Sequence, residues 1–308
     1  MRASFWAFVQ KPFKRQHKGE KEPTETTSVT QLIFDTMDLM FNLRGIGWSW
    51  SKGLRVPKEE RDVNSVPSFL ASTLYYFITS FLFFDFAFYA MQFLGPTTIA
   101  SPTGSSIFDP SLPPLLRYAR ATLISYLTGF VVTESIQAFY YLSTLIFVGL
   151  LGQTPEQWPH ISDTPWWSPS LSDYWSHRWH QLFRDCFINF CGKPFSMLTG
   201  RAGGVMGAFL ASGLLHDWGL YSMGRGKNFR NVAGYFLMQG VGVMMEHTWK
   251  AATGKRVGGF LGWAWSISWV VGWGIMLLDA WASHGLVGSQ FIPEPYRPSV
   301  LVFGSVLA

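Results

Sequence analysis

The chain has 308 residues, of which 48% are hydrophobic, 17% are aromatic and only 14% are charged. Soluble domains carry about 25% charged residues. The deficit here is concentrated in long uncharged runs, which predicts an all-α, polytopic integral membrane protein. The formal charge of +5 lies largely in the N-terminal tail and in short loops. It indicates contact with a membrane surface and argues against nucleic-acid binding.

The N-terminal part is predicted to be a tail followed by a short helix. Residues 1–30 are polar and basic, and no sustained apolar run follows the charges, so we expect a flexible tail and not a signal peptide. Residues 31–50 carry apolar side chains at helical spacing, with Asp35 and Asp38 on the opposite side, and then break at the glycine-containing stretch Arg44–Trp48. This pattern predicts a helix lying in the membrane interface, followed by a turn.

Four apolar segments are long enough to cross a bilayer, namely 68–94, 119–151, 202–223 and 257–282. The second fits either one tilted helix or two short ones. A shorter segment, 231–249, is basic on both flanks, so its crossing stays open. We expect 183–199 to be a second interfacial helix and 152–169 to be a surface loop that carries His160. The membrane domain then covers 31–290, and 291–308 is a C-terminal tail.

The segment Ser170–Leu182, SLSDYWSHRWHQL, is the most distinctive part of the chain. Ser172 and Asp173 are good candidates to cap a short helix. On that helix the two histidines would share one face and the two tryptophans another, an arrangement that suits the membrane boundary. The aromatic and basic side chains of the segment are Tyr174, Trp175, Trp179, His177, Arg178 and His180.

His216 is the second distinctive residue, because it lies inside the apolar segment 202–223. Small residues at every fourth position lead up to it, with Gly204, Ala208 and Ser212 in one row and Gly203, Gly207 and Ala211 in the next. Small residues let helices approach closely in lipid, so we expect His216 to point into a protein interface or a cavity. Histidine is the usual general base; the alternative is a histidine that hydrogen-bonds across a helix pair for packing alone.

A metal site is a weaker interpretation of the same residues. His177, His180, His216 and Asp217 could supply ligands. Membrane di-iron enzymes, however, use many histidines in repeated boxes, and this chain has seven in all. We therefore expect no metal. The sequence also lacks the G-x-S-x-G, P-loop and H-E-x-x-H motifs of hydrolases, NTPases and zinc proteases.

The stretch SLSDYWSHRWHQLFRD resembles the wax synthase-like branch of the membrane-bound O-acyltransferase (MBOAT) family. The resemblance rests on two motifs of that branch: a Trp-His-Gln motif, and a Ser-Gly-Leu-His segment that follows it in an apolar helix. Here these motifs are Trp179–Gln181 and Ser212–His216, with 36 positions between the two histidines. Arg44–Trp48 and Met244–Trp265 resemble the same branch, so the resemblance runs from about Asp38 to the last apolar segment.

The resemblance implies a multi-helix bundle around a tunnel and acyl transfer from acyl-CoA to an alcohol, with no other cofactor. It implies that His216 is the general base and that His180 orients the acceptor or stabilises the oxyanion. It places Trp179, Gln181 and Ser212 at the substrates and Arg178 at the CoA phosphates. The partners are then acyl-CoA, a lipophilic alcohol and the bilayer, and the location is the endoplasmic reticulum.

The choice of substrate depends on the loop before the motif. Its Pro/Trp-rich sequence resembles fungal secondary-metabolite acetyltransferases, so we expect an acetyl donor and a terpenoid-like acceptor. The alternative within the class is a long-chain wax ester synthase that uses fatty alcohols. The alternative outside it is a non-enzymatic membrane transporter or scaffold. Relatives commonly have more spans upstream of Arg44–Trp48, so we expect either a minimal form or a sequence that lacks its start.

Overall fold

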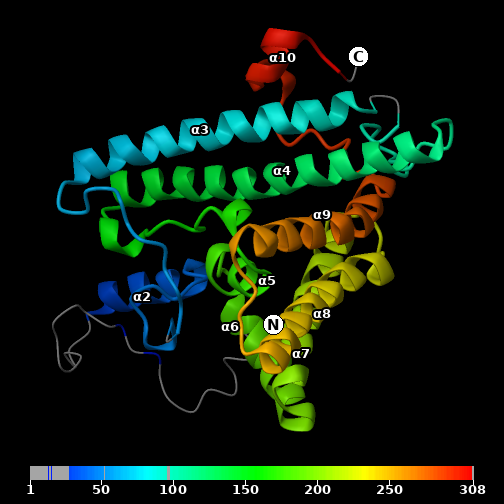
Figure 1. Ribbon diagram of the computed structural model, residues 1–308. Helices are drawn as coiled ribbons and strands as arrows, with labels where there is room; N and C mark the ends of the chain where they lie inside the picture. The colour runs from blue at the N-terminus through cyan, green and yellow to red at the C-terminus, as the bar shows by residue number, and fades with distance from the viewer. Residues whose placement is uncertain (1–12, 14, 16–27, 52, 96–97, 307–308) are drawn as a thin grey trace.

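The computed structural model describes residues 13, 15, 28–51, 53–95 and 98–306, and these form a bundle of helices (Figure 1). Most of the predicted tail, 1–30, lies outside the described residues. Within the described ranges there is no strand, only an isolated bridge between Arg15 and Trp48. The predicted all-α fold is confirmed.

Two long helices, α3 (Val66–Phe93) and α4 (Pro114–Gly149), lie side by side along one edge of the bundle (Figure 1). The predicted segment 119–151 therefore forms one helix up to Gly149 and not two short ones. The helix α3 begins at Ser65, whose side chain accepts a hydrogen bond from the Ser68 amide. Inside α3, Asp85 is fully buried, and Arg297 Nε donates to it at 2.8 Å. A buried carboxylate needs such a partner, and the pair holds α10 (Pro298–Phe303) against α3.

Below α4 lie α7 (Lys193–Ser222), α8 (Phe229–Thr253) and α9 (Gly259–Ser283), each packed on the next (Figure 1). In the part of the chain that the structure describes, α3, α4 and α9 are the three helices that are long and apolar enough to cross a membrane. The segments 202–223 and 231–249 are helical, within α7 and α8, and their crossing stays a prediction.

The helix α7 is broken at Thr199 and Gly200. Gly200 has a φ of 69°, which favours glycine, and it reverses the chain direction. The segment before the break, which includes α6 (Arg184–Phe187) and a π-helical turn (Ile188–Gly192), folds back along α7. A Cβ atom on Gly207 would lie only 2.6 Å from the Cys191 carbonyl oxygen. The small-residue rows thus give the close helix approach that the sequence predicted, and 183–199 is largely helical as expected.

The helix α2 (Val29–Phe41) lies to one side of the bundle (Figure 1). Its acidic side faces Arg15, which pairs with Asp35 at 2.8 Å and with Asp38 at 3.1 Å. The exposed side is apolar and includes Leu32, Ile33, Phe34, Met37, Met40 and Phe41. The predicted helix is confirmed, as is the turn after it, in which Gly45 and Gly47 have positive φ. Its contact with the membrane stays a prediction.

Candidate active site

The motif segment begins with a short helix, α5 (Leu171–Asp173), whose first turn is held by two side chains. Ser170 Oγ accepts a hydrogen bond from the Asp173 amide at 3.0 Å, so Ser170 is the N-cap. The prediction that Ser172 or Asp173 caps the helix is wrong. The reason lies in α8, where Glu246 accepts from the Leu171 amide at 2.6 Å and from the Ser172 amide at 2.9 Å. A carboxylate at the amino end of a helix satisfies its free N–H groups.

After α5 the chain makes a π-helical turn (Tyr174–Arg178) and becomes extended at Trp179. This geometry separates the two histidines that were expected to share a face. His177 Nδ1 lies 2.7 Å from Asp173 Oδ1, one turn back along the chain, whereas His180 follows the end of the turn. Trp175 and Trp179 do pack together, edge to face, with centroids 5.9 Å apart.

Arg178 is occupied by the protein itself. Its Nε donates to Asp173 Oδ2 at 2.5 Å, and its Nη1 donates to the Asp163 carbonyl and to Thr164 Oγ1, both at 3.2 Å. Burial alone would raise the pKa of Asp173, but the hydrogen bonds from His177 and Arg178 outweigh it and lower that pKa. Arg178 therefore ties the preceding loop to the motif, and its contact with CoA stays a prediction that this geometry does not support.

A cavity of about 910 Å³ lies between the motif segment and helices α4, α7, α8 and α9. This volume is at the upper end for a small-molecule site. The cavity brings together five of the six residues that the sequence singled out, and Arg178 is absent from its wall. The five are Trp179, His180, Gln181, Ser212 and His216.

His216 is held in one orientation by the backbone of its own helix. Its Nδ1 lies 2.8 Å from the Ser212 carbonyl oxygen, one turn earlier in α7. Because a carbonyl oxygen can only accept, Nδ1 must carry the proton, and Nε2 keeps a free lone pair. The ring packs against Phe236 of α8, with centroids 4.4 Å apart. Within the described residues Nε2 has no hydrogen-bond partner, so it can accept a proton from a molecule in the cavity.

His180 faces the same cavity from the motif segment. Its Nδ1 is buried and has no hydrogen-bond partner in the described part of the chain, which leaves Nε2 as the ring nitrogen that can reach the cavity. Burial, with a further contribution from electrostatic repulsion by His216 and Arg44, lowers the pKa of His180 to about 3. The ring is therefore neutral near pH 7, when it can donate one N–H bond without carrying charge.

The other motif residues shape the wall around the two histidines. The Trp179 ring stacks on Tyr174, with centroids 5.6 Å apart, and also contacts the ring of His180. Gln181 is buried; its Nε2 donates to the Trp179 carbonyl at 3.0 Å, and its Oε1 has no partner among the described residues. Ser212 contributes the carbonyl that fixes His216. These contacts indicate that the three residues position the histidines, and their contact with substrate stays a prediction.

Two of the four candidate metal ligands, His177 and Asp217, are bound to other partners and do not join His180 and His216 at the cavity. Asp217 Oδ1 accepts from the Asn228 amide at 2.8 Å and so fixes the start of α8. His177 is bound to Asp173 and does not line the cavity. Across the described ranges no group of three metal-binding side chains occurs.

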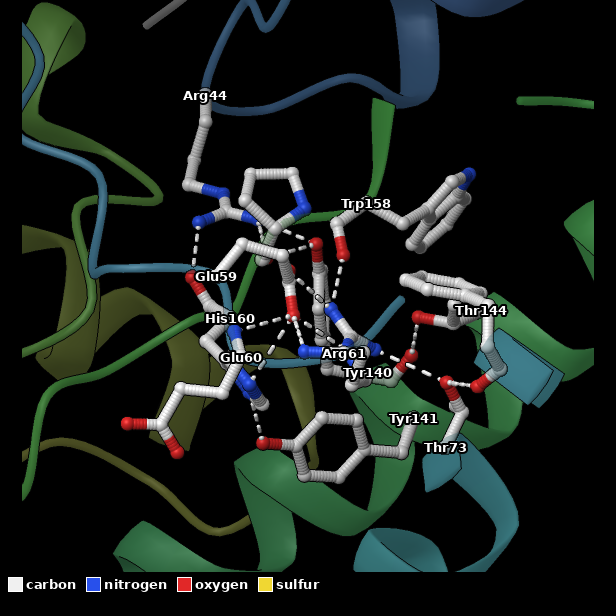
Figure 2. Close-up of polar contacts among 12 residues, drawn as sticks. Arg44, Glu59, Glu60, Arg61, Thr73, Tyr140, Tyr141, Thr144, Trp158 and His160 are labelled. Atoms are coloured by element: carbon white, nitrogen blue, oxygen red, sulfur yellow. Dashed lines mark hydrogen bonds and ion pairs between the residues drawn. The ribbon is translucent and has the colours of Figure 1, made fainter. Parts of the chain in front are cut away.

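A second polar cluster lies beside α3 and α4, and sequence reasoning missed it (Figure 2). Arg44 donates to the carbonyls of Pro159 and His160, both at 2.7 Å, and Arg61 donates to that of Trp158 at 2.6 Å. Both arginines are 5% exposed. The cluster therefore fixes the chain just before the motif. In the sequence, Arg61 stands in a charged loop and looks like an ordinary solvated residue.

His160 belongs to this cluster, so the expectation that it lies in a surface loop is wrong. It is buried, and its Nδ1 lies 2.8 Å from the Tyr141 hydroxyl (Figure 2). Burial and the Arg61 charge lower its pKa, so its 3.4 Å contact with Glu59 joins a neutral ring to a carboxylate. The loop is buried because its carbonyls find arginine donors and need no water.

Glu246 offers a test of how the motif is held. Replacing it with alanine leaves the Leu171 and Ser172 amides and Trp265 Nε1 without their acceptor. Each unsatisfied buried donor costs about 1–3 kcal/mol, so we expect the free energy of unfolding to fall by at least ~2 kcal/mol. Thermal unfolding of the detergent-purified protein measures this. Glu246→Gln, which keeps one acceptor oxygen, should lose less, and Glu156→Ala on the surface should change nothing. An unchanged midpoint for Glu246→Ala would contradict the capping role.

The comparisons with known proteins agree with this geometry. Residues 158–238 match the family described as "Membrane bound O-acyl transferase family". That range starts at the loop held by Arg61 and contains His180 and His216, which line the cavity. The resemblance to the wax synthase-like branch of the membrane-bound O-acyltransferases is confirmed.

Individual relatives of this chain come from plants and fungi. A long-chain-alcohol O-fatty-acyltransferase of Simmondsia chinensis is 28% identical over 101 residues, covering 30% of this chain and 29% of the relative. The acetyltransferase aurG of Calcarisporium arbuscula is 28% identical over 168 residues, covering 49% of this chain and 40% of the relative. The O-Mevalon transferase yanI of Aspergillus niger is 25% identical over 259 residues, covering 73% of this chain and 55% of the relative.

The chain spans 55% or less of the length of these relatives. No solved structure shows significant similarity to it. The membrane-bound O-acyltransferase match thus covers the motif segment, α7 and the start of α8, which form part of the cavity wall. The activity of the whole chain belongs to the proposal below.

Proposed function

We propose that this chain is an acyl-CoA-dependent O-acyltransferase of an endoplasmic-reticulum membrane. It would move an acyl group, most favourably acetyl, onto the hydroxyl of a lipophilic, terpenoid-like metabolite. The observation that carries the proposal is the lone pair on His216 Nε2, held at a cavity wall by the Nδ1 bond to Ser212, with neutral His180 on the same cavity.

The reaction follows from these two side chains. His216 Nε2 takes the hydroxyl proton of the acceptor as its oxygen attacks the thioester carbonyl carbon. The carbonyl oxygen becomes an oxyanion, to which the N–H of His180 donates. The C–S bond then breaks, the CoA thiolate takes the proton back from His216, and the products are the ester and free CoA. Nothing is left bonded to the protein.

The donor is supported by three basic side chains on the cavity wall, Arg184, Lys193 and Arg201. None of them forms an ion pair with a described residue. Arg201 and His216 lie on one unbroken stretch of α7, and 15 residues of helix span about 22 Å. The phosphopantetheine arm of CoA has about 13 bonds from sulfur to the first phosphorus, and at ~1.2 Å per bond it reaches about 15 Å. The remaining distance fits the diphosphate and the ribose phosphate.

Arg184 and Arg201 test this assignment directly. Charge-assisted hydrogen bonds are worth about 1.5–3 kcal/mol, so Arg184→Glu and Arg201→Glu should each raise the KM for acetyl-CoA about tenfold or more. The KM for acetyl-pantetheine, which has no phosphates, should stay the same. Arg256→Glu, the same charge change on a residue outside the cavity wall, is the control. Equal losses with both donors would remove the phosphate assignment.

The proposed activity itself is tested in isolated membranes. Labelled acetyl-CoA and palmitoyl-CoA are each incubated with a terpenoid alcohol and with hexadecanol, and ester and free CoA are measured together. Acetyl ester of the terpenoid should dominate. Palmitoyl ester of hexadecanol would favour the wax ester alternative, which the Simmondsia relative supports. No thioester-dependent product with any pair would favour a transporter or scaffold. Co-sedimentation with an endoplasmic-reticulum marker checks the location.

A further inference from the structure

One half of the cavity is lined almost entirely by apolar surface. It lies between α4 and α9, and the hydroxyl groups in it are already used inside the protein. Ser125 Oγ donates to the Val271 carbonyl at 2.7 Å, and Thr128 Oγ1 donates to the Ile124 carbonyl at 2.9 Å. The surface that these residues present to the cavity is therefore hydrocarbon, which suits an apolar chain or ring system. The remaining lining of α4, α9 and the loop before α5 is Gly129, Val132, Ile136, Trp166, Val270, Val271, Gly274, Leu277, Leu278 and Trp281.

Trp166 lines this part of the cavity, and its ring rests directly on the backbone of α4. A Cβ atom at Gly129 would lie 2.2 Å from Trp166 Cη2, so only glycine permits this position. The indole also stacks on Phe130, with centroids 4.5 Å apart, and meets Tyr126 edge to face at 5.7 Å. It is thus held on one side by the α4 backbone and by two aromatic rings.

The main chain of Trp166 is fixed from the opposite helix. Trp263 Nε1 of α9 donates to the Trp166 carbonyl at 2.8 Å. Trp166 belongs to the short turn Pro165–Trp167, five residues before the start of α5. Trp166 therefore spans one wall of the cavity, with its carbonyl bound to α9 and its ring on α4. Its position is set by the loop that leads into the motif segment.

We propose that Trp166, seated on Gly129, sets the size of the apolar group that the acceptor can place in the cavity. This inference rests on the proposed function for the identity of the acceptor. The physical reason is volume. Replacing an indole by a methyl group opens a void on the order of 100–150 Å³, a size that holds a ring such as benzene in an apolar pocket. A methyl group added at Gly129 pushes the indole the other way, into the cavity.

The test compares Trp166→Ala, Trp166→Phe and Gly129→Ala with the unmodified protein, using a series of primary alcohols of increasing length and one polycyclic terpenoid alcohol. Each methylene that fits should raise kcat/KM roughly fourfold, the ratio that ~0.8 kcal/mol gives, until the cavity is full. We call the longest alcohol that still gains from an added methylene the size limit. The two Trp166 variants should move this limit to longer or bulkier alcohols, and Trp166→Ala should move it further than Trp166→Phe. Gly129→Ala should move it to shorter ones.

The control is Trp167→Ala. Trp167 is the next residue, is 70% exposed and does not line the cavity, so its loss should leave the limit in place. Gly129→Ala also guards against a folding defect, because misfolding lowers activity for every alcohol but does not shift the limit toward short ones. An unchanged limit in Trp166→Ala and Gly129→Ala would overturn the proposal.

A binding measurement separates this inference from the proposed function. Equilibrium binding of labelled alcohols to the purified full chain is measured without any thioester. If the chain forms no ester but the binding limit moves with Trp166→Ala, the size assignment stands and the activity fails. If ester forms and neither the binding limit nor the kinetic limit moves, the activity stands and Trp166 has no part in selection.

Discussion

Replacing His216 with alanine should lower the turnover number by a factor on the order of 10²–10⁴, the usual contribution of a general base. The Ser212 carbonyl fixes the protonated nitrogen of the ring, so the other nitrogen is free to accept the proton of an acceptor. Without it, the hydroxyl must attack the thioester in its neutral form. Initial rates of ester and of free CoA formation in isolated membranes, at matched protein levels, measure the loss. Insertion should survive, because the ring faces a cavity and its removal leaves only a modest gap.

Two other histidines serve as controls. His284 at the end of α9 makes the same kind of bond, from Nδ1 to the Ala280 carbonyl at 2.7 Å, but it is not on the cavity wall. His284→Ala therefore removes the same atoms and the same backbone bond without touching the proposed chemistry. His177→Ala changes the motif itself, outside the cavity. Both should keep most of the activity. If His216→Ala is near normal while His177→Ala is inactive, the reaction takes place elsewhere.

Replacing His180 with alanine should cost a factor of about 10²–10³, as removal of one oxyanion donor does in other acyl-transfer sites. His180→Asn, which keeps an N–H donor, should recover part of the loss. Because the pKa of His180 is lowered to about 3, its ring stays neutral from about pH 5 upward. The His180→Ala variant should therefore keep the pH–rate profile of the unmodified protein over that range.

The double variant His180→Ala/His216→Ala distinguishes one site from two. If both side chains act on one transition state, the double variant should lose less than the product of the two single losses. Multiplicative losses would mean that the histidines act independently. A shift in the pH–rate profile of His180→Ala would contradict a neutral donor and would favour His180 as the titrating group.

Part of this architecture follows from local sequence patterns. The runs that became α3, α4 and α9 are apolar over enough residues that a helix is the one way to satisfy their backbone in lipid. The rows of small residues before His216 predicted a close helix approach, and the Gly207 contact with the Cys191 carbonyl is one. The family resemblance implied that His180 and His216 act at one site, and both line the same cavity.

Other features depend on partners that are distant in the chain. The sequence favoured Ser172 or Asp173 as a helix cap, but Glu246, 75 positions from Leu171, occupies the free amides there. Arg178 looked free to bind phosphate, yet the π-helical turn brings it onto Asp173. A π-turn has no strong residue signature, so helical spacing misplaces the side chains that follow it.

The sequence by itself determined the helical membrane class and the close helix approach before His216, because apolar length and rows of small residues are local properties. Tertiary structure alone decided which charges are buried and which face the cavity. Arg61 and Arg184 each precede an aspartate in the sequence, but the fold places Arg61 on the Trp158 carbonyl and Arg184 on the cavity wall. A charged side chain costs little in water and much when buried, so its place depends on which distant donors and acceptors the folded chain brings to it.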